Sequence, residues 1–145
     1  MELSHDGLIL LEQFESLRLR AYDDGMGTIT IGWGHTINVH PGQEITRDQA
    51  LRFLNNDVRS AVGNVITFAL GIDLNQNQFD ALVSFEYNTG GLEKSTLLVK
   101  LKANDVCGAA IEFSRWIYAG GAISVGLINR RLVEAQLFIK DYYSQ

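Results

Sequence analysis

The sequence predicts one α+β domain in which a small sheet-bearing lobe and a helical lobe are joined by a long helix. Three observations support this: residues 28–33 alternate as a strand does, a capping box at Thr46 opens a long apolar stripe, and helical patterns follow from Asn75 onward. The predicted boundaries within the single domain, 1–145, are 17–46 for the small lobe, 47–70 for the connecting helix, and 1–16 with 71–145 for the helical lobe.

The first helix is predicted near the start of the chain. Ser4 and Asp6 are residue types that cap helices, and apolar side chains recur at helical spacing, so one helix face should be buried. Glu15 lies beside that face, near the predicted helix end. The apolar residues are Ile9, Leu10, Leu11, Phe14 and Leu17.

The period changes after this helix. Residues 23–27, Asp-Asp-Gly-Met-Gly, are typical of a turn, and the alternating residues that follow are typical of a strand. We therefore predict an antiparallel hairpin that folds back toward the first helix and brings Asp24 and Thr30 within reach of Glu15. Residues 37–45 contain the only proline, next to a glycine, and should form a loop.

The connecting helix has the clearest local signals. Thr46 and Gln49 fit the capping box, in which each side chain bonds the other residue's backbone N–H. The stripe that follows predicts about 20 helical residues, or about 30 Å, which is long enough to join two lobes. Its residues are Ala50, Leu51, Leu54, Val58, Ala61, Val62, Val65 and Ile66.

From Asn75 the chain is predicted to be all-helical. One helix should stop at residues 88–91, and Ser95 or Thr96 should cap the next. Another is expected from about Val106 to Trp116, broken by the glycines at 120 and 121, and the last from about Val125. In the last helix we expect Leu127, Leu132 and Leu137 to point inward, and Arg130, Arg131 and Glu134 to lie elsewhere.

Charge and composition exclude several classes of protein. A net charge of −5 argues against a nucleic-acid binder, which needs a basic surface. The apolar run 8–11 is too short for a membrane span or a signal core, so we expect a soluble protein without stable membrane insertion. We also expect a monomer. Cys107 is the single cysteine and is expected to be a buried thiol. No Cys/His set has zinc spacing, so neither a metal nor a cofactor is expected.

Two carboxylates flanking a cleft are the minimum for cleaving a glycosidic bond: one donates a proton and the other activates water. Glu15 is the better candidate acid, because an apolar surrounding favours a protonated carboxyl group. Asp24, in a solvated turn, is the candidate base, and Thr30 could help hold the water. Asp23 is a rival for Asp24. On spacing alone, acidic residues near helix ends and in turns usually just face water, without any catalytic role.

The spacing of these residues nevertheless resembles that of the phage-type lysozymes, or endolysins, of glycoside hydrolase family 24. Glu15 is followed after eight residues by Asp24, after five more by Thr30, and then by Ile-Gly-Trp-Gly-His-Thr at 31–36. The resemblance covers most of the chain. Further matching segments are 45–48, 53–58, 74–82, 87–90, Trp116, 120–121, 126–127 and 130–131.

This resemblance implies a lysozyme-like fold and hydrolysis of the β-1,4 bond between N-acetylmuramic acid and N-acetylglucosamine in peptidoglycan, with inversion. By position, Glu15 is the general acid, Asp24 activates or positions water, and Thr30 completes the triad. Inversion predicts that the two carboxyl groups stand roughly 6.5–9.5 Å apart, whereas about 5 Å would favour a covalent intermediate.

Other residues have expected roles around the cleft. The resemblance matches His35 and Asp57 to an ion pair between the small lobe and the long helix. Thr36, Tyr87 and Asn88 are candidates for holding the sugar chain. Alternatively, Tyr87 could simply pack in the core, and Asn88 could cap its helix.

Further charged and aromatic residues have structural interpretations. Glu86 could face the cleft as a third carboxylate, but we expect it to pair with a surface arginine. Trp33 and Trp116 are expected in the core. The arginines near helix ends could meet the anionic wall polymer, but are expected instead to cap helix carbonyls or to bridge to glutamates. They are Arg115, Arg130 and Arg131, with Glu112 and Glu134 as the partners.

Two rival functions remain open. A lytic transglycosylase cleaves the same bond with one acidic residue and leaves an anhydro product, and the presence of Asp24 and Thr30 favours hydrolysis instead. A non-catalytic peptidoglycan-binding module would require loss of the triad. The resemblance also implies glycan strands as the partner, a bacteriolytic role in host cell lysis, and a path from the host cytoplasm through a separate pore to the periplasm or cell wall. The target bacterium and any N-terminal leader stay open.

Overall fold

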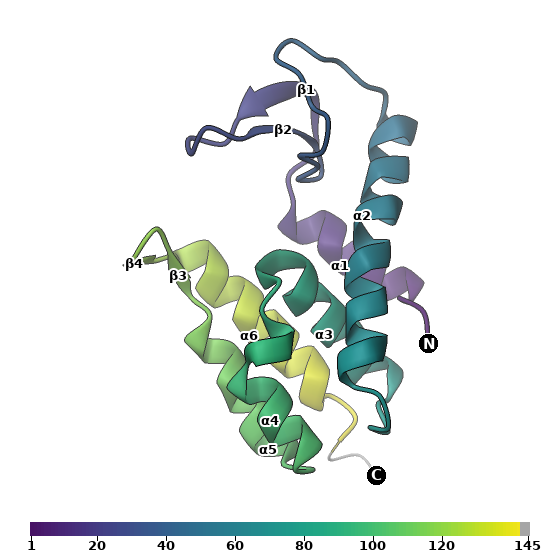
Figure 1. Cartoon of the computed structure of the whole chain (residues 1–145), viewed down its shortest axis with the longest axis vertical. Coiled ribbons are helices and arrows are strands. Elements are labelled where there is room, and N and C mark those ends of the chain that lie inside the picture. The colour runs from purple at the N-terminus through teal and green to yellow at the C-terminus, as the bar shows by residue number, and fades with distance from the viewer. Residues whose placement is uncertain (143–145) are drawn as a thin grey trace.

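The computed structural model describes residues 1–142, most of them helical (Figure 1). The last three residues of the predicted helical lobe, 143–145, lie outside the described residues. In chain order the elements are α1 (His5–Phe14), β1 (Arg18–Asp23), β2 (Ile29–Gly32), α2 (Arg47–Phe68), α3 (Gln76–Thr89), the 3-10 turn η1 (Leu92–Lys94), α4 (Thr96–Lys102), α5 (Val106–Glu112), the 3-10 turn η2 (Phe113–Arg115), β3 (Tyr118–Ala119), β4 (Ala122–Ile123) and α6 (Val125–Ile139).

The first hairpin forms where the sequence predicts it. Strands β1 and β2 pair antiparallel, with Tyr22 opposite Thr30. The predicted loop 37–45 is less irregular than expected, because its end runs along β1: Ala21 N–H donates to Gln43 O at 2.9 Å, and Ile45 N–H donates to Leu19 O at 2.9 Å. These bonds satisfy backbone groups that would otherwise be unpaired at the strand edge.

Helix α2 joins the sheet-bearing part to the helical part, as Figure 1 shows. The predicted capping box is present: Gln49 N–H donates to Thr46 Oγ1 at 3.2 Å, and Thr46 N–H donates to Gln49 Oε1 at 2.9 Å. The helix has 22 residues and is therefore about 33 Å long. Its buried residues keep the predicted helical spacing and are Ala50, Leu54, Val58, Ala61 and Val65.

Helix α3 is the centre of the helical part, where it contacts α1, α2 and α6. Every residue from Gln78 to Glu86 is buried, which is typical of a helix surrounded by others. The buried carboxylate of Asp80 is satisfied by Ser4 N–H at 3.1 Å and by Gln76 Nε2 at 2.8 Å. The start of α1 is thus fixed to α3, which helps to place the end of α1 beside the cleft.

The chain after Asn75 is not all-helical, so that expectation is wrong. Tyr118 pairs with Ile123, and Ala119 with Ala122, in a second small hairpin. Its turn is Gly120-Gly121, with φ values of +58° and +83°. Two successive residues with positive φ make the tight turn that a two-residue hairpin needs, rather than only a helix break. Helix α5 also ends earlier than predicted, at Glu112, and continues as η2.

The expected inner face of α6 is wrong for Leu132 and for the three charged residues, although Leu137 does pack against the core. Leu132 is 55% exposed, whereas Arg131 is 1% exposed and Glu134 is fully buried. Arg130 is buried with them, while Leu127 and Leu137 are only half-buried. The reason is that the side of α6 that packs on α3 carries charged side chains, which bond each other and polar groups of α3, in place of leucines.

Two further properties of the described residues concern solvent and membranes. Cys107 is exposed rather than buried, because Val106 and Ala109 occupy the core side of α5. Trp33 is buried and Trp116 packs against the core, as expected. Within residues 1–142, no helix combines the length and the apolar character needed to cross a membrane.

Candidate active site

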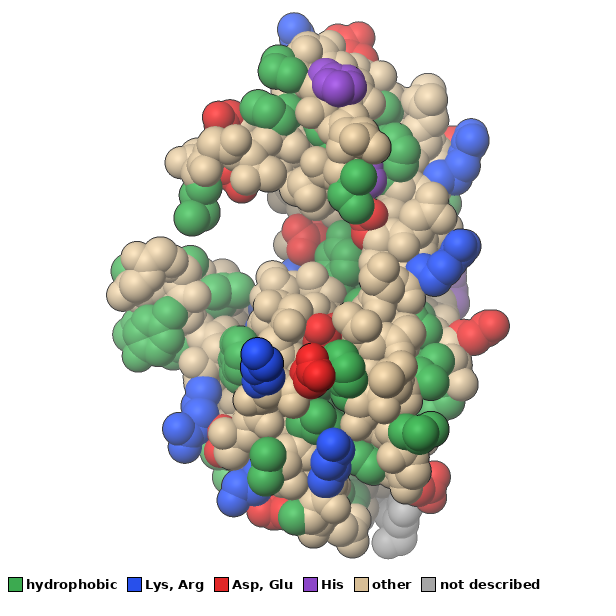
Figure 2. All heavy atoms as spheres, viewed as in Figure 1, with side chains coloured by type: hydrophobic (Ala, Val, Ile, Leu, Met, Phe, Trp, Pro, Cys, Tyr) green, Lys and Arg blue, Asp and Glu red, His purple; other side chains and the backbone are tan. Residues whose placement is uncertain are grey.

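A cavity of about 640 Å³ lies between the sheet-bearing part and the helical part. Figure 2 shows the molecule hollowed between these two parts. The lining comes from the end of α1, the segment after β2, and the facing sides of α2 and α3. Residues far apart in the sequence therefore meet at one solvent-open site, as in an enzyme cleft.

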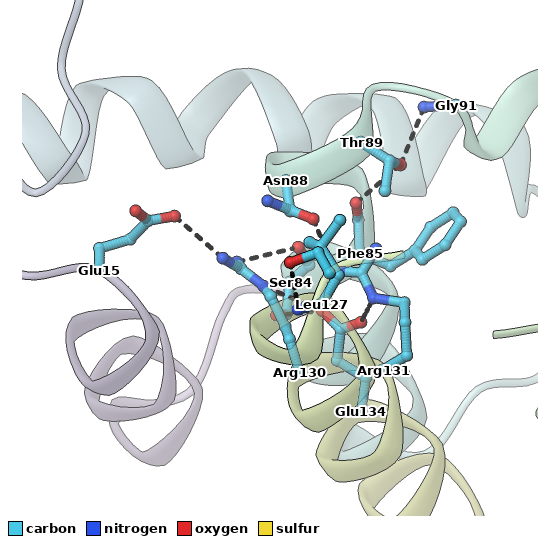
Figure 3. Close-up of polar contacts among 11 residues, drawn as sticks. Glu15, Ser84, Phe85, Asn88, Thr89, Gly91, Leu127, Arg130, Arg131 and Glu134 are labelled. Carbon is cyan, nitrogen blue, oxygen red and sulfur yellow. Dashed lines mark hydrogen bonds and ion pairs between the residues drawn. The ribbon is translucent and has the colours of Figure 1, made fainter. Parts of the chain in front are cut away.

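Glu15 is the C-cap residue of α1, and its side chain lines this cavity. Its backbone N–H still bonds Leu11 O at 3.0 Å, but its backbone is extended, so the chain leaves the helix here. The side chain is 25% exposed, and Oε1 accepts from Arg130 Nη1 at 2.9 Å, as Figure 3 shows. The Arg130 guanidinium also stands 4.8 Å above the Phe14 ring. Glu15 is thus held from α6 and remains open to the cavity.

Gly34 allows the backbone to pass close to this carboxylate. Its φ is +81°, and a Cβ there would lie 3.3 Å from Glu15 Oε2 and 3.9 Å from Tyr87 Oη. Both the conformation and the close approach favour glycine. The glycine therefore keeps space around Glu15 for a ligand.

Asp23, the last residue of β1, and Asp24, the first residue of the turn after it, make the same pattern of hydrogen bonds. Oδ1 of Asp24 accepts from Met26 N–H at 2.8 Å and Thr28 N–H at 3.2 Å. Oδ1 of Asp23 accepts from Gly25 N–H at 2.8 Å and Gly27 N–H at 3.2 Å. Both carboxylates are exposed and both organise the turn, so these contacts do not distinguish the two candidates.

Thr30 is buried on β2, and its hydroxyl lies 3.4 Å from Thr28 O. Neither Thr30 nor Asp24 is among the described residues that line the cavity at Glu15. Glu15 is therefore the one member of the predicted triad that the cavity includes.

The structure brings His35 and Asp57 together on the cavity wall. His35 Nδ1 lies 2.8 Å from Asp57 Oδ2, and the imidazole stacks on Phe53 with ring centroids 4.2 Å apart. Because His35 follows β2 and Asp57 is on α2, this contact fastens the sheet-bearing part to the long helix.

The three predicted sugar contacts, Thr36, Tyr87 and Asn88, all line the cavity. The Tyr87 hydroxyl donates to Trp33 O at 3.1 Å, and its pKa is raised by burial and by the charges of Glu15 and Asp57. Asn88 Oδ1 accepts from Arg131 Nη2 at 2.7 Å. Asn88 therefore bonds α6, and the helix ends instead at Gly90 with a φ of +62°.

Glu86 does not pair with a surface arginine, so that expectation is wrong. Its side chain is on the cavity wall and only 5% exposed. Oε2 accepts from Leu92 N–H at 3.1 Å, and the Asn64 side chain also hydrogen-bonds the carboxylate. Burial raises the pKa of Glu86. The alternative of a third carboxylate facing the cleft is the one the structure supports.

The other expected bridges form. Arg115 Nε lies 2.7 Å from Glu112 Oε2, and Arg131 Nε lies 2.7 Å from Glu134 Oε1. Arg130 Nε is 3.5 Å from Glu134 Oε2, which also accepts from Ser84 Oγ at 2.6 Å. Figure 3 shows this buried cluster extending to Glu15 through Arg130.

No group of three or more His, Cys, Asp or Glu side chains is placed to hold a metal ion in residues 1–142. The chemistry that this site can perform with its own groups is proton transfer by carboxyl groups. A sequence model of the family described as phage lysozyme matches residues 12–134, which include every candidate residue above.

The chain belongs to the phage lysozyme family. Membership makes it a lysozyme-type glycoside hydrolase and confirms the endolysin-like muramidase function that the sequence motifs indicated. The substrate that this family implies is peptidoglycan, which agrees with the polymer that the sequence predicted as the partner.

Relatives of this lysozyme-family chain agree with the assignment. An endolysin of Acyrthosiphon pisum secondary endosymbiont phage 1 is 40% identical over 144 residues, covering 95% of this chain and 98% of the relative. The endolysin of Bacillus phage B103 is 43% identical over 145 residues and 96% of this chain, but the match spans only 54% of that relative's length.

The fold comparison gives the same result. The structure of the endolysin from Escherichia coli O157:H7 phage FAHEc1 superposes with a TM-score of 0.88 at 36% identity, covering 97% of this chain and 95% of that one. The predicted α+β, lysozyme-like fold is therefore confirmed.

Two contributors to the site were not found from the sequence of this lysozyme-family chain. Asn64 and Ser60 line the cavity from α2. Their spacing from Asp57 is helical, so a search for polar residues on the Asp57 face of that helix could have found them. The contact of Arg130 with Glu15 had no such local signal.

Proposed function

We propose that the chain hydrolyses the β-1,4 bond between N-acetylmuramic acid and N-acetylglucosamine in peptidoglycan, with inversion at the anomeric carbon. The observation that carries the proposal is Glu15, held by Arg130 at the wall of the solvent-open cavity between the two parts of the molecule. A cavity of about 640 Å³ is in the range of ligand sites.

Glu15 acts as the general acid that protonates the leaving oxygen. Once the proton has been transferred, a carboxylate remains, and the guanidinium of Arg130 at 2.9 Å stabilises that charge. Gly34 leaves room beside the carboxyl group for the sugar. The protein thereby positions the acid and stabilises the ion that it becomes.

Asp24 acts as the base that activates or positions the attacking water, and Thr30 completes the triad. The two backbone N–H groups on Asp24 Oδ1 fix the orientation of its carboxylate. The proposal requires roughly 6.5–9.5 Å between the carboxyl groups of Glu15 and Asp24, the separation that leaves room for a water molecule.

Thr36 contacts the sugar chain from the sheet-bearing wall, and Tyr87 and Asn88 contact it from α3 on the facing wall. The lobe 17–46 forms one wall and the helical lobe, residues 1–16 with 71–142, forms the other, and bending near the ends of α2 opens and closes them around the strand. The chain works as a monomer. It acts in the periplasm or cell wall, which it reaches from the host cytoplasm through a separate pore-forming protein.

The test is the clearing of permeabilised bacterial cells by the wild type and by Glu15→Gln. We expect a loss of at least about a hundred-fold, the usual contribution of a general acid. Glutamine keeps an oxygen acceptor for Arg130, so the fold should be unchanged. Glu12→Gln, one turn earlier on α1, is the matched control and should keep its activity. Full activity of Glu15→Gln would exclude Glu15 as the acid.

A further inference from the structure

Three carboxylates line the cavity, and they differ in their charge partners. Glu15 pairs with Arg130, and Asp57 lies against His35. Among the ion pairs of residues 1–142, none involves Glu86. Glu86 is thus the one carboxylate on this wall, within the described chain, that has no basic side chain as a partner.

The groups that do contact Glu86 are neutral. Leu92 N–H donates to Oε2 at 3.1 Å, and the Asn64 side chain hydrogen-bonds the carboxylate. Burial and the nearby negative charge of Glu93 both raise the pKa of Glu86. A buried carboxylate is costly to ionise unless a cation balances it, so this part of the wall favours a positive ligand.

The position of Glu86 along the cleft indicates which part of a substrate would reach it. Asp57 and Asn64 are seven positions apart on α2, or about 10 Å. Asp57 bonds His35, the neighbour in the chain of Gly34, and Gly34 lies close to Glu15, whereas Asn64 bonds Glu86. If the bond to be cleaved lies at Glu15, the part of the substrate that contacts Glu86 is therefore a substituent or a neighbouring sugar.

We propose that Glu86, with Asn64 and Ser60, forms a subsite for a primary ammonium group carried by the peptidoglycan. This inference rests on the proposed function, since it deepens the recognition of the same substrate. An ammonium group has three donors and one positive charge. Glu86 supplies the charge, and the oxygens of Asn64 and Ser60 supply further acceptors from α2. The ammonium has two sources in this polymer: the diamino acid of uncross-linked stem peptides, or a glucosamine that has lost its acetyl group.

The first test compares kcat/KM on uncross-linked peptidoglycan before and after its amines are acetylated with acetic anhydride. We expect acetylation to lower the wild-type value by about ten-fold, the size of one charge-assisted hydrogen bond. Glu86→Gln should start about ten-fold lower on the untreated polymer and change little on acetylation. Glu93→Gln removes the neighbouring charge outside the cavity lining and should respond to acetylation as the wild type does.

A second comparison separates the two ammonium sources. One substrate consists of glycan strands stripped of their peptides and partly deacetylated on their sugars; the other keeps its peptides and is fully acetylated on its sugars. If the ammonium comes from the stem peptide, wild type and Glu86→Gln should differ only on the second substrate. If it comes from the sugar, they should differ only on the first.

The inference fails if acetylation affects the wild type and Glu86→Gln equally. It also fails if Glu93→Gln behaves as Glu86→Gln does. The proposed function is judged separately, because it requires wild-type cleavage of the fully acetylated polymer whatever the effect of Glu86.

A binding measurement does not depend on cleavage or on a substitution. If the stem peptide is the source, the peptide L-alanyl-γ-D-glutamyl-L-lysine should shift the carboxyl carbon resonance of Glu86 in the wild-type protein. If the sugar is the source, glucosamine should shift it instead. The same peptide acetylated on its lysine Nζ should not. Equal shifts with free and acetylated amines, or no shift with either amine, would overturn the proposal.

Discussion

Arg130 Nη1 lies 2.9 Å from Glu15 Oε1, so the last helix meets the end of the first helix at the proposed acid, although 115 positions separate the two residues. The same guanidinium approaches Glu134 Oε2 through Nε, at 3.5 Å. Arg130 thus links the cavity to a buried ionic cluster between α3 and α6. The stability of that cluster should therefore influence both the fold and the position of Glu15.

Arg131→Met tests the buried cluster. Arg131 is 1% exposed and lies 2.7 Å from the fully buried Glu134, whose only remaining ion pair would be the longer one with Arg130, beside the hydrogen bond from Ser84 Oγ. Removing one partner of a buried ion pair leaves a charge poorly balanced, so the free energy of unfolding should fall by about 3–5 kcal/mol. Urea unfolding followed by circular dichroism measures this.

The chain offers a control with the same spacing. Arg115 also pairs with a glutamate three positions away, Glu112, but its own side chain is 74% exposed. Arg115→Met leaves Glu112, which is itself only 8% exposed, without its partner, but water reaches this pair from the arginine side, so the loss should be smaller than for Arg131→Met. If the two substitutions lowered the free energy of unfolding equally, burial of the Arg131 pair would make no difference to its contribution.

Asp24→Asn and Asp23→Asn identify the base. Each carboxylate accepts two turn N–H groups through Oδ1, and an asparagine Oδ1 can accept the same bonds. The two variants should therefore fold alike and serve as controls for each other. We expect Asp24→Asn to lower the rate of cell clearing by about a hundred-fold or more, and Asp23→Asn to remain near the wild type. The opposite pattern would assign the base to Asp23.

Glu86→Gln should change how stability depends on pH. Burial raises the folded-state pKa of Glu86 above its ordinary value of 4.5. The carboxyl group therefore stabilises the fold fully below pH 4.5, and this contribution is lost as the pH rises through the folded-state pKa. Glutamine does not titrate and can still accept from Leu92 N–H.

The difference in the free energy of unfolding, Glu86→Gln minus wild type, should accordingly increase as the pH rises through the folded-state pKa and then stay constant. Urea unfolding at a series of pH values measures the difference. A difference that stays constant across the acidic range would show that Glu86 does not titrate as its burial requires.

The elements that the sequence predicted well are those with local causes. The turn at 23–27 and the capping box of Thr46 and Gln49 involve neighbours in the chain, so their chemistry is visible in the sequence. The hairpin of β1 and β2 and the start of α2 formed accordingly. The glycines at 120 and 121 were also recognised as a break, but the pairing of Tyr118 with Ile123 was not.

The inward charges of α6 were not predictable in this way. Leucine is the usual core residue, and Arg131 is buried only because Glu134 and Asn88 are placed to bond it. For the same reason Glu86 was assigned to the surface: its partners, Leu92 N–H and Asn64, become neighbours only in the fold. In the site, the family motif located Glu15, but its contact with Arg130 depends on the packing of α6.

The central claim is inverting hydrolysis with Glu15 as the acid, and the most direct test is the structure of the first product. Purified peptidoglycan is digested briefly, and the new muramic acid ends are examined at once by NMR and mass spectrometry. We predict reducing ends that carry one added water and are formed first as the α anomer. First formation of the β anomer would contradict inversion, and a 1,6-anhydro end would contradict hydrolysis.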